Sequence, residues 1–212
     1  GATDLDDIST LNMLGGNLTL SDTALTNVDG LSSLYLWCGE DLSITDNSSL
    51  SNVDGLSNLT PVRGNLTISN NDALDHVDGL MGRTTLDGDL IITDNDGATD
   101  WASLSSITEV TGDVTISGNY LPGGLADISG LTTIHGNLTI SDNEFVDHLI
   151  GLPSLTSVHG DISVLRNTGL VSLSMDSLTL VDGDILISNN DALTSFSLDS
   201  LTTLDQSLFI GD

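Results

Sequence analysis

The chain contains no lysine, and its 3 basic residues stand against 31 acidic residues in a length of 212. A net charge of −28 excludes binding to nucleic acid, which requires clustered positive charge, and disfavours binding to anionic membranes for the same reason. The single cysteine, Cys38, cannot form a disulfide within the chain, and we expect it to be buried as a small apolar residue. No run of 18 apolar residues is present, so the sequence predicts no insertion into a membrane.

Recognisable catalytic motifs are also missing. The chain has no Gly-x-Ser-x-Gly and no His-Glu-x-x-His, which would indicate a serine hydrolase or a zinc protease. Aromatic residues make up 3% of the chain, so rings on which a sugar could stack are scarce. These absences favour a protein that is not an enzyme. A carbohydrate-acting enzyme stays open as an alternative, because a chain this rich in Asp places many carboxylates near one another.

A phrase of 23 to 25 residues repeats along the whole chain, Gly-x-Leu-x-Ile-x-x-Asn followed by an apolar residue at every third position. In the copy that opens at Gly136, Leu138 and Ile140 alternate with polar residues, which is typical of a half-buried strand. The later apolar positions lack the spacing of an α-helix. We therefore predict an all-β fold, a parallel β-solenoid of about eight coils in a single domain of residues 1–212, with little or no α-helix.

Three features depart from the regular repeat. Pro122-Gly123-Gly124 predicts a reshaped loop, and Arg83 stands where other coils have an apolar residue, which predicts a bulge that takes its charge to solvent. Leu208 and Ile210 begin a strand shortly before the sequence stops. Because an open final coil would expose apolar surface and a strand edge, we expect this domain to be a piece of a longer array.

An asparagine follows the strand in seven coils. A turn that is buried in every coil leaves backbone N–H and C=O groups to be paired, and an Asn amide can both donate and accept. We interpret this column as a structural ladder, formed by Asn47, Asn71, Asn95, Asn119, Asn143, Asn167 and Asn190.

Four phrases carry a resemblance to a known family: Gly64 to Leu80, Gly88 to Asp96, Gly136 to Gly160 and Gly183 to Leu198. They resemble the leucine-rich-repeat-like coils of receptor L-domains, a type of repeat that also occurs in microbial surface proteins. The resemblance covers nearly the whole chain and implies a right-handed solenoid. It implies no set of active residues, because members of that group bind different things. The paired cysteines of the receptors are absent here.

Hydroxyl side chains occupy the outward positions of most predicted strands, in two columns. Ser and Thr are ordinary residues on a solvated strand face, yet the regular Thr-x-Thr pattern also resembles the ice-binding face of antifreeze proteins. We take this face as the candidate binding surface, with the residues Thr19, Ser21, Ser43, Thr45, Thr67, Ser69, Thr93, Thr115, Ser117, Thr139 and Ser141.

Carboxylates and imidazoles also recur in columns. Asp89, Asp113, Asp161 and Asp184 follow the opening glycine of their coils, and two carboxylates ~4.8 Å apart repel by ~1 kcal/mol in water. Ca²⁺ would relieve that repulsion at these four residues, although the fold requires no cofactor, and a solvated acidic face is the alternative. His135 and His159 are predicted to stack, either as the ligands of a transition metal or as neighbours without a metal.

These patterns predict a non-catalytic recognition or adhesion scaffold that presents a flat Ser/Thr strand face with acidic rims. The richness in Asp, Ser and Thr together with a single cysteine indicates a protein that is secreted or displayed at the cell surface. The expected partner is a protein or carbohydrate ligand, or ice. An ice-binding protein is the first alternative, and a carbohydrate-acting enzyme is the second.

Overall fold

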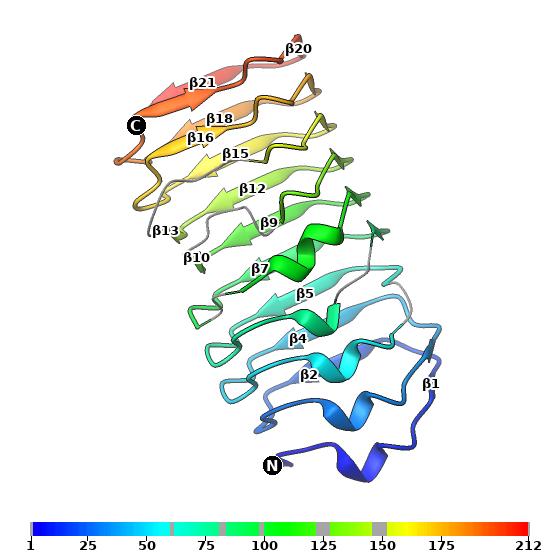
Figure 1. The fold of residues 1–212 in the computed structure, drawn as a ribbon. Coiled ribbons are helices and arrows are strands. Elements are labelled where there is room, and N and C mark those ends of the chain that lie inside the picture. The colour runs from blue at the N-terminus through cyan, green and yellow to red at the C-terminus, as the bar shows by residue number, and fades with distance from the viewer. Residues whose placement is uncertain are drawn as a thin grey trace.

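The computed structural model describes residues 2–59, 62–80, 84–97, 100–121, 128–145 and 152–211. The coils stack into an elongated body with the two termini at opposite ends (Figure 1). The expected loop at Pro122-Gly123-Gly124 and the expected bulge at Arg83 lie outside the described residues.

One long parallel sheet runs the length of the stack. It has nine strands in the order β2-β4-β5-β7-β9-β12-β15-β18-β21, so each coil contributes one strand. Leucine, isoleucine or valine at the first and third positions points into the core in all strands before the last, which gives an alternation of buried and outward residues. The strands are β2 (Leu18–Ser21), β4 (Leu42–Thr45), β5 (Leu66–Ser69), β7 (Leu90–Thr93), β9 (Val114–Ser117), β12 (Leu138–Ser141), β15 (Ile162–Leu165), β18 (Ile185–Ser188) and β21 (Leu208–Gly211).

A second parallel sheet is built from two-residue strands that precede the opening glycines. Its order is β20-β17-β14-β11-β8-β6, with β6 (Thr85–Leu86), β8 (Glu109–Val110), β11 (Thr133–Ile134), β14 (Ser157–Val158), β17 (Leu180–Val181) and β20 (Thr203–Leu204). Three further strand pairs are also parallel: β1 (Met13–Leu14) with β3 (Leu36–Trp37), β10 (Tyr120–Leu121) with β13 (Glu144–Phe145), and β16 (Ser172–Ser174) with β19 (Ser195–Ser197).

Short 3₁₀ helices close the first five coils on the remaining side of the stack (Figure 1). They are η1 (Asp6–Ile8), η2 (Asp29–Leu31), η3 (Asp54–Leu56), η4 (Asp78–Leu80) and η5 (Ala102–Ser106), and the described residues contain no α-helix. The predicted all-β fold, a parallel β-solenoid with almost no helix, is confirmed.

The core is a continuous column of aliphatic side chains inside the stack. In the coil from Gly136, Leu138 and Ile140 are fully buried, as the strand alternation predicts, and Leu155 and Val158 are fully buried, as the three-residue rhythm predicts. Among the described residues, the inner coils bury the same positions, whereas the corresponding leucines of the first and last coils are only partly buried or exposed. Each coil therefore depends on its neighbours to cover its apolar face.

Cys38 corrects one prediction, because its side chain is exposed and not buried. The preceding residue, Trp37, takes the inward position of β3, where its indole Nε1 donates to the Gly16 carbonyl at 2.8 Å. Successive side chains of a strand point to opposite sides, so Cys38 is directed to solvent.

Candidate functional site

The residues of the predicted binding face lie in two aligned columns on the long sheet. Strand pairing places Thr19, Ser43, Thr67, Ile91, Thr115, Thr139, Ser163, Leu186 and Phe209 in one column, and Ser21, Thr45, Ser69, Thr93, Ser117, Ser141, Leu165, Ser188 and Gly211 in the other. Most of the hydroxyl residues are half-buried or exposed. Ser141 is buried, and its Oγ donates to Ser117 Oγ at 3.0 Å.

The face changes character toward its C-terminal end. Leu165, Leu186 and Phe209 replace hydroxyl residues on its last three strands, and Phe209 is 50% exposed. An open depression of about 210 Å³ lies there, lined by Asp161, Ile162, Ser163, Asp184, Ile185, Leu186, Ser207 and Phe209. The hydroxyl surface is therefore regular over the strands from β2 to β12, apart from Ile91, and beyond them it mixes Ser163 and Ser188 with apolar side chains.

The four candidate metal-binding aspartates belong to a hydrogen-bonded column at the start of the strands. Asp89 Oδ1 accepts from the backbone N–H of Asp113 at 2.8 Å, and Asp161 Oδ1 accepts from that of Asp184 at 2.8 Å. Asp113 and Asp184 accept in the same way from Asn137 and Ser207, both at 2.7 Å. One oxygen of each carboxylate thus pairs a backbone group of the next coil, which links the coils along this column.

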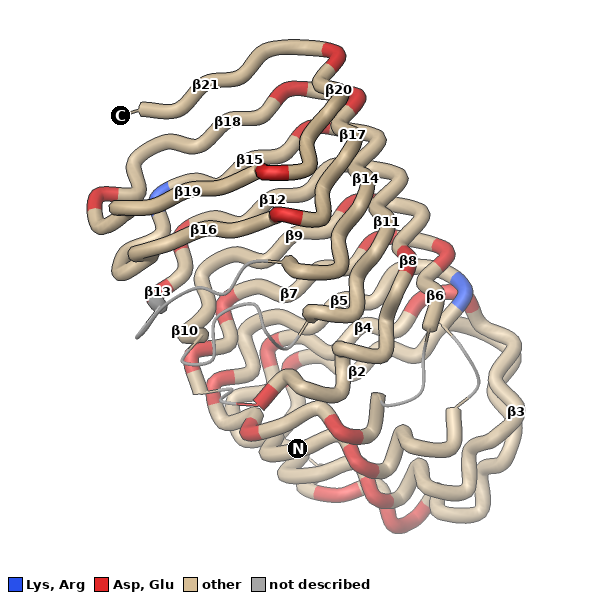
Figure 2. Tube along the Cα trace, turned by 45° about the horizontal axis from the view of Figure 1, so that its top comes forward, with Lys and Arg blue, Asp and Glu red and all other residues tan. Residues whose placement is uncertain are grey.

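Asp41 is a further member that the sequence pattern missed. Its Oδ1 accepts from the N–H of Asn65 at 2.8 Å, while its own N–H donates to Asn17 Oδ1 at 3.1 Å. Glu40 is inserted between Gly39 and Asp41, so a count forward from the glycine selects the wrong residue. A count backward from the strand would have found it. Figure 2 shows acidic residues in rows along the stack.

This geometry predicts that Asp113→Asn will leave the stability unchanged or raise it. An amide oxygen can accept the same backbone bond, as it does at Asn65 and Asn137, and the substitution removes one repelling charge. Asp113→Ala should lower the free energy of unfolding by about 1 kcal/mol, because it removes the acceptor for Asn137. Chemical denaturation measures both variants, and an Asn variant as damaged as the Ala variant would show that the charge itself is needed.

A salt comparison tests the calcium hypothesis for the same column. Because the folded protein concentrates a net charge of −28, screening should raise the melting temperature, and NaCl and CaCl₂ should act alike at matched ionic strength. If the folded state had specific Ca²⁺ sites, millimolar Ca²⁺ alone would raise the melting temperature, because a ligand that binds only the folded state stabilises it. A calcium-specific rise of several degrees, reversed by a chelator and lost in Asp89→Asn/Asp113→Asn, would contradict this expectation.

The seven predicted asparagines form a buried ladder along the turns that follow the strands. Asn119 is typical, since its Nδ2 donates to the Ile92 and Ser117 carbonyls, both at 2.9 Å. Its Oδ1 accepts from the backbone N–H of Asn95 at 3.1 Å, and its own N–H donates to Asn143 Oδ1 at 3.0 Å. The first coil joins through Thr23, whose N–H donates to Asn47 Oδ1 at 3.2 Å. These contacts support the structural interpretation of the column.

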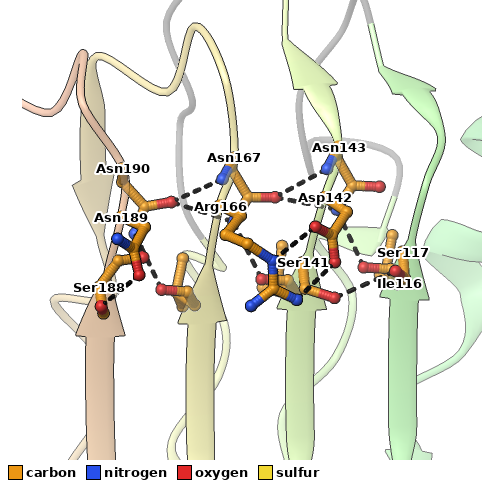
Figure 3. A network of polar contacts seen from close by, with 12 residues as sticks. Ile116, Ser117, Ser141, Asp142, Asn143, Arg166, Asn167, Ser188, Asn189 and Asn190 are labelled. Carbon is orange, nitrogen blue, oxygen red and sulfur yellow. Dashed lines mark hydrogen bonds and ion pairs between the residues drawn. The ribbon is translucent and has the colours of Figure 1, made fainter. Parts of the chain in front are cut away.

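The residue before each of these turns has a positive φ, and one of them is an arginine. The position is held by Asp22, Asp46, Asn70, Asp94, Gly118, Asp142, Arg166 and Asn189, with φ between 52° and 66°. Asp, Asn and Gly tolerate this left-handed region, whereas an arginine there is uncommon. Arg166 donates through Nε and Nη2 to the two carboxylate oxygens of Asp142, at 2.7 and 2.8 Å (Figure 3).

The Arg166 hydrogen bond holds the pKa of Asp142 below its usual value. A lowered pKa in the folded state means that this pair stabilises the fold above the unfolded pKa of about 4 and loses its effect as the pH falls through the folded value. Arg166→Asn should relieve backbone strain at φ 52° and lose an exposed ion pair, so the melting temperature at neutral pH should shift by no more than about 3 °C. Thermal melts at pH 6 and near pH 2 should show wild type losing more stability than the variant, and equal losses would contradict the role of the pair.

His135 and His159 stack as predicted, with ring centroids 5.2 Å apart and planes inclined by 18°. Each ring also contacts a carboxylate, since His135 Nε2 lies 2.8 Å from Glu109 Oε1 and His159 Nδ1 lies 2.7 Å from Asp182 Oδ2. Sequence spacing identified the stacked pair but not these two partners. Among the described residues, no group of three or more His, Cys, Asp or Glu side chains is placed to hold a metal ion.

A threonine ladder on the second sheet was also missed. The side-chain hydroxyl of Thr108 donates to the Thr84 carbonyl at 2.9 Å, and Thr132, Thr156, Thr179 and Thr202 repeat this bond one coil further along each time. All of these threonines lie two residues before the inward-facing residue of a short strand, so the repeat pattern could have identified them. The ladder shows that a regular hydroxyl column can serve the backbone, so the candidate face on the long sheet needs a test of its own.

In a comparison with known proteins, no family model and no curated protein matches the chain. Within the described residues, the structure has no helix with the length and hydrophobicity needed to cross a membrane.

Proposed function

We propose that this protein is a non-catalytic recognition or adhesion scaffold whose Ser/Thr strand face contacts its ligand. The observation that carries the proposal is the alignment of hydroxyl residues over successive strands of one sheet, where Thr19, Ser43 and Thr67 lie directly beside one another. A packed aliphatic core behind the strands holds this surface rigid. Binding of a ligand therefore costs little conformational entropy of the protein.

The chemistry of the face fits a polar ligand. Each hydroxyl can donate one hydrogen bond and accept two, and the carboxylates at the start of the strands add acceptors along one rim. A protein surface or a carbohydrate offers the matching groups. We further propose that the protein acts outside the cell or at its surface and that its coils are of the leucine-rich-repeat-like L-domain type. The acidic composition and the repeated phrase support these two points.

Ice is the second candidate ligand. The aligned columns favour it, because an ice surface is a regular lattice of hydrogen-bonding groups. Ile91 interrupts the first column, Ser141 is turned into a buried contact, and the neighbouring aspartates carry charge close to the plane of the face. A recognition surface tolerates such irregularities better than an ice lattice does.

A pair of charge variants tests the proposal. Thr115→Glu/Thr139→Glu places two charges in the middle of the face, and Ser32→Glu/Ser57→Glu places the same two charges beside the 3₁₀ helices η2 and η3 as a matched control. Labelled wild type is applied to a panel of immobilised glycans and cell-surface proteins, and ice growth is measured in parallel.

We expect wild type and the control to bind one class of glycan or protein, and the face variant to lose at least about tenfold in affinity, the equivalent of 1.4 kcal/mol. If wild type inhibits ice growth and the face variant does not, the ligand of this face is ice. Turnover of a bound glycan would reveal a carbohydrate-acting enzyme. If the face variant and the control variant bind equally well, the strand face does not contact the ligand.

A further inference from the structure

The first two coils expose an apolar patch that the proposed function does not use. Met13 and Leu36 are direct neighbours in the β1–β3 pair and are 59% and 47% exposed. Tyr35 precedes Leu36 and is 53% exposed, and the exposed Cys38 follows two residues later. Strands alternate their side chains, so Leu36 and Cys38 point the same way. We call these four residues the β1–β3 patch.

The β1–β3 patch is also free of charge in an acidic protein. Residues 8–21 and 30–39 contain no charged residue, although the whole chain carries 31 acidic ones. Elsewhere the acidic residues run in rows along the stack (Figure 2). A molecule of like charge is repelled by those rows, so this uncharged surface is the place where it can approach most closely.

We propose that the β1–β3 patch is the interface of a homodimer. A cationic partner would be drawn to the acidic rows, where the field is strongest, and not to an uncharged patch. A partner that docks on the uncharged patch is better matched if it is acidic itself, and a second copy of this chain has that property. Exposed Met and Tyr side chains are typical of interface cores, where charged residues are depleted.

The rim of the patch is self-complementary. Glu40 and Arg63 are exposed, and they lie on adjacent coils, because the N–H of Gly64 donates to the Glu40 carbonyl at 2.7 Å. A two-fold axis through the patch brings the same surface of both copies together, so Arg63 of one copy can face Glu40 of the other. The patch is small compared with a standard interface of ~800 Å² per partner, so we expect a micromolar dissociation constant.

Light scattering after size exclusion measures the oligomeric state directly. With about 100 μM protein, suited to a micromolar Kd, we expect a mass moving from the 22.0 kDa of one chain toward twice that value. The dimer fraction should increase from about 0.15 M to about 1 M NaCl, because the screening length falls from about 8 Å to about 3 Å. Met13→Ser/Leu36→Ser should remain monomeric at both salt concentrations. The control Leu186→Ser/Phe209→Ser removes a half-buried and an exposed apolar side chain from the opposite end and should dimerise like wild type.

Charge-reversal variants test whether the partner at this patch is a second copy of the same chain. Glu40→Arg and Arg63→Glu should each weaken dimerisation by up to about fivefold, in line with an exposed ion pair. An equimolar mixture of these two variants should dimerise better than either variant alone, because the copies then carry opposite charges at the facing positions. Coupling of a bulky maleimide to Cys38 should block dimerisation, whereas Cys38→Ser should not.

Three results would overturn the proposal: a 22.0 kDa monomer of wild type at both salt concentrations, an unchanged dimer in Met13→Ser/Leu36→Ser, or a mixture of the charge variants no better than its components. None of these measurements involves a ligand, so their failure would leave the proposed function of the strand face untouched.

Discussion

Replacing Asn119 by alanine should lower the free energy of unfolding by about 3 kcal/mol. The substitution removes the side chain that pairs the Ile92 and Ser117 carbonyls and accepts the N–H of Asn95. That N–H is then buried without its acceptor, and a buried unpaired group costs about 1–3 kcal/mol before the other lost bonds are counted. Urea denaturation followed by circular dichroism provides the measurement.

Asn58→Ala is the matched control for this experiment. Asn58 is exposed, and its amide donates to the Ser32 carbonyl at 2.8 Å, so its loss should change the stability by no more than about 0.5 kcal/mol. Similar midpoints for Asn119→Ala and wild type would show that water replaces the amide and that the ladder is not needed for stability.

Replacing Gly79 by alanine should have an effect of similar size, about 3 kcal/mol, for a steric reason. Gly79 lies in η4 directly above the backbone of the previous coil, and an added Cβ would overlap the Val53 carbonyl. That carbonyl accepts the N–H of Leu56 at 2.9 Å, so it cannot move aside without disturbing the turn of η3. Overpacking of a well-packed interior costs about 1–3 kcal/mol and occasionally more.

Two further substitutions define this experiment. Gly15→Ala is the control, because no atom lies within 4 Å of its added Cβ, and it should leave the denaturation midpoint nearly unchanged. Ser103 occupies the corresponding place in the next coil, where its Oγ donates to the Val77 carbonyl at 2.9 Å. Gly79→Ser should therefore cost less than Gly79→Ala. A Gly79→Ala variant as stable as Gly15→Ala would mean that neighbouring coils can separate at little cost.

The sequence was sufficient for the fold because both periods in it are strict. Alternation at Leu138 and Ile140 and the three-residue rhythm through Leu155 and Val158 each allow a single inward face, and a shift by one residue would expose the core. The columns of the long sheet followed from the same register, so the neighbours of Thr67 and Thr115 were predicted residue by residue. Right-handed winding and the family resemblance stay predictions.

The side-chain contacts within a column were beyond that reasoning. Repeat spacing states which residues share a column, but not that His159 reaches forward to Asp182 or that Arg166 reaches back to Asp142. Those contacts depend on side-chain length and rotamer, which the period does not fix. The prediction for Cys38 was wrong for a different reason, because its apolar character was weighed above the strand alternation that follows the buried Trp37.

The asparagine ladder runs in one direction, and this has a consequence for how such a chain can change length. Each internal Asn donates its own N–H and Nδ2 to the Oδ1 of the following Asn. Its Oδ1 accepts from the preceding Asn, and its Nδ2 also donates to a carbonyl of the preceding coil, so every internal coil forms the same set of bonds on each side. Removing the whole segment 88–111 would join the coil of residues 64–87 directly to the coil that opens at Gly112, and each column would again continue with residues of the same kind. A loss that is not close to a whole number of coils would shift the columns out of register, whereas a difference of one residue is absorbed between strands, as at Glu40. The molecule can therefore grow or shrink by gene duplication and deletion in steps of one coil, and its contact surface would lengthen or shorten by one strand with each step.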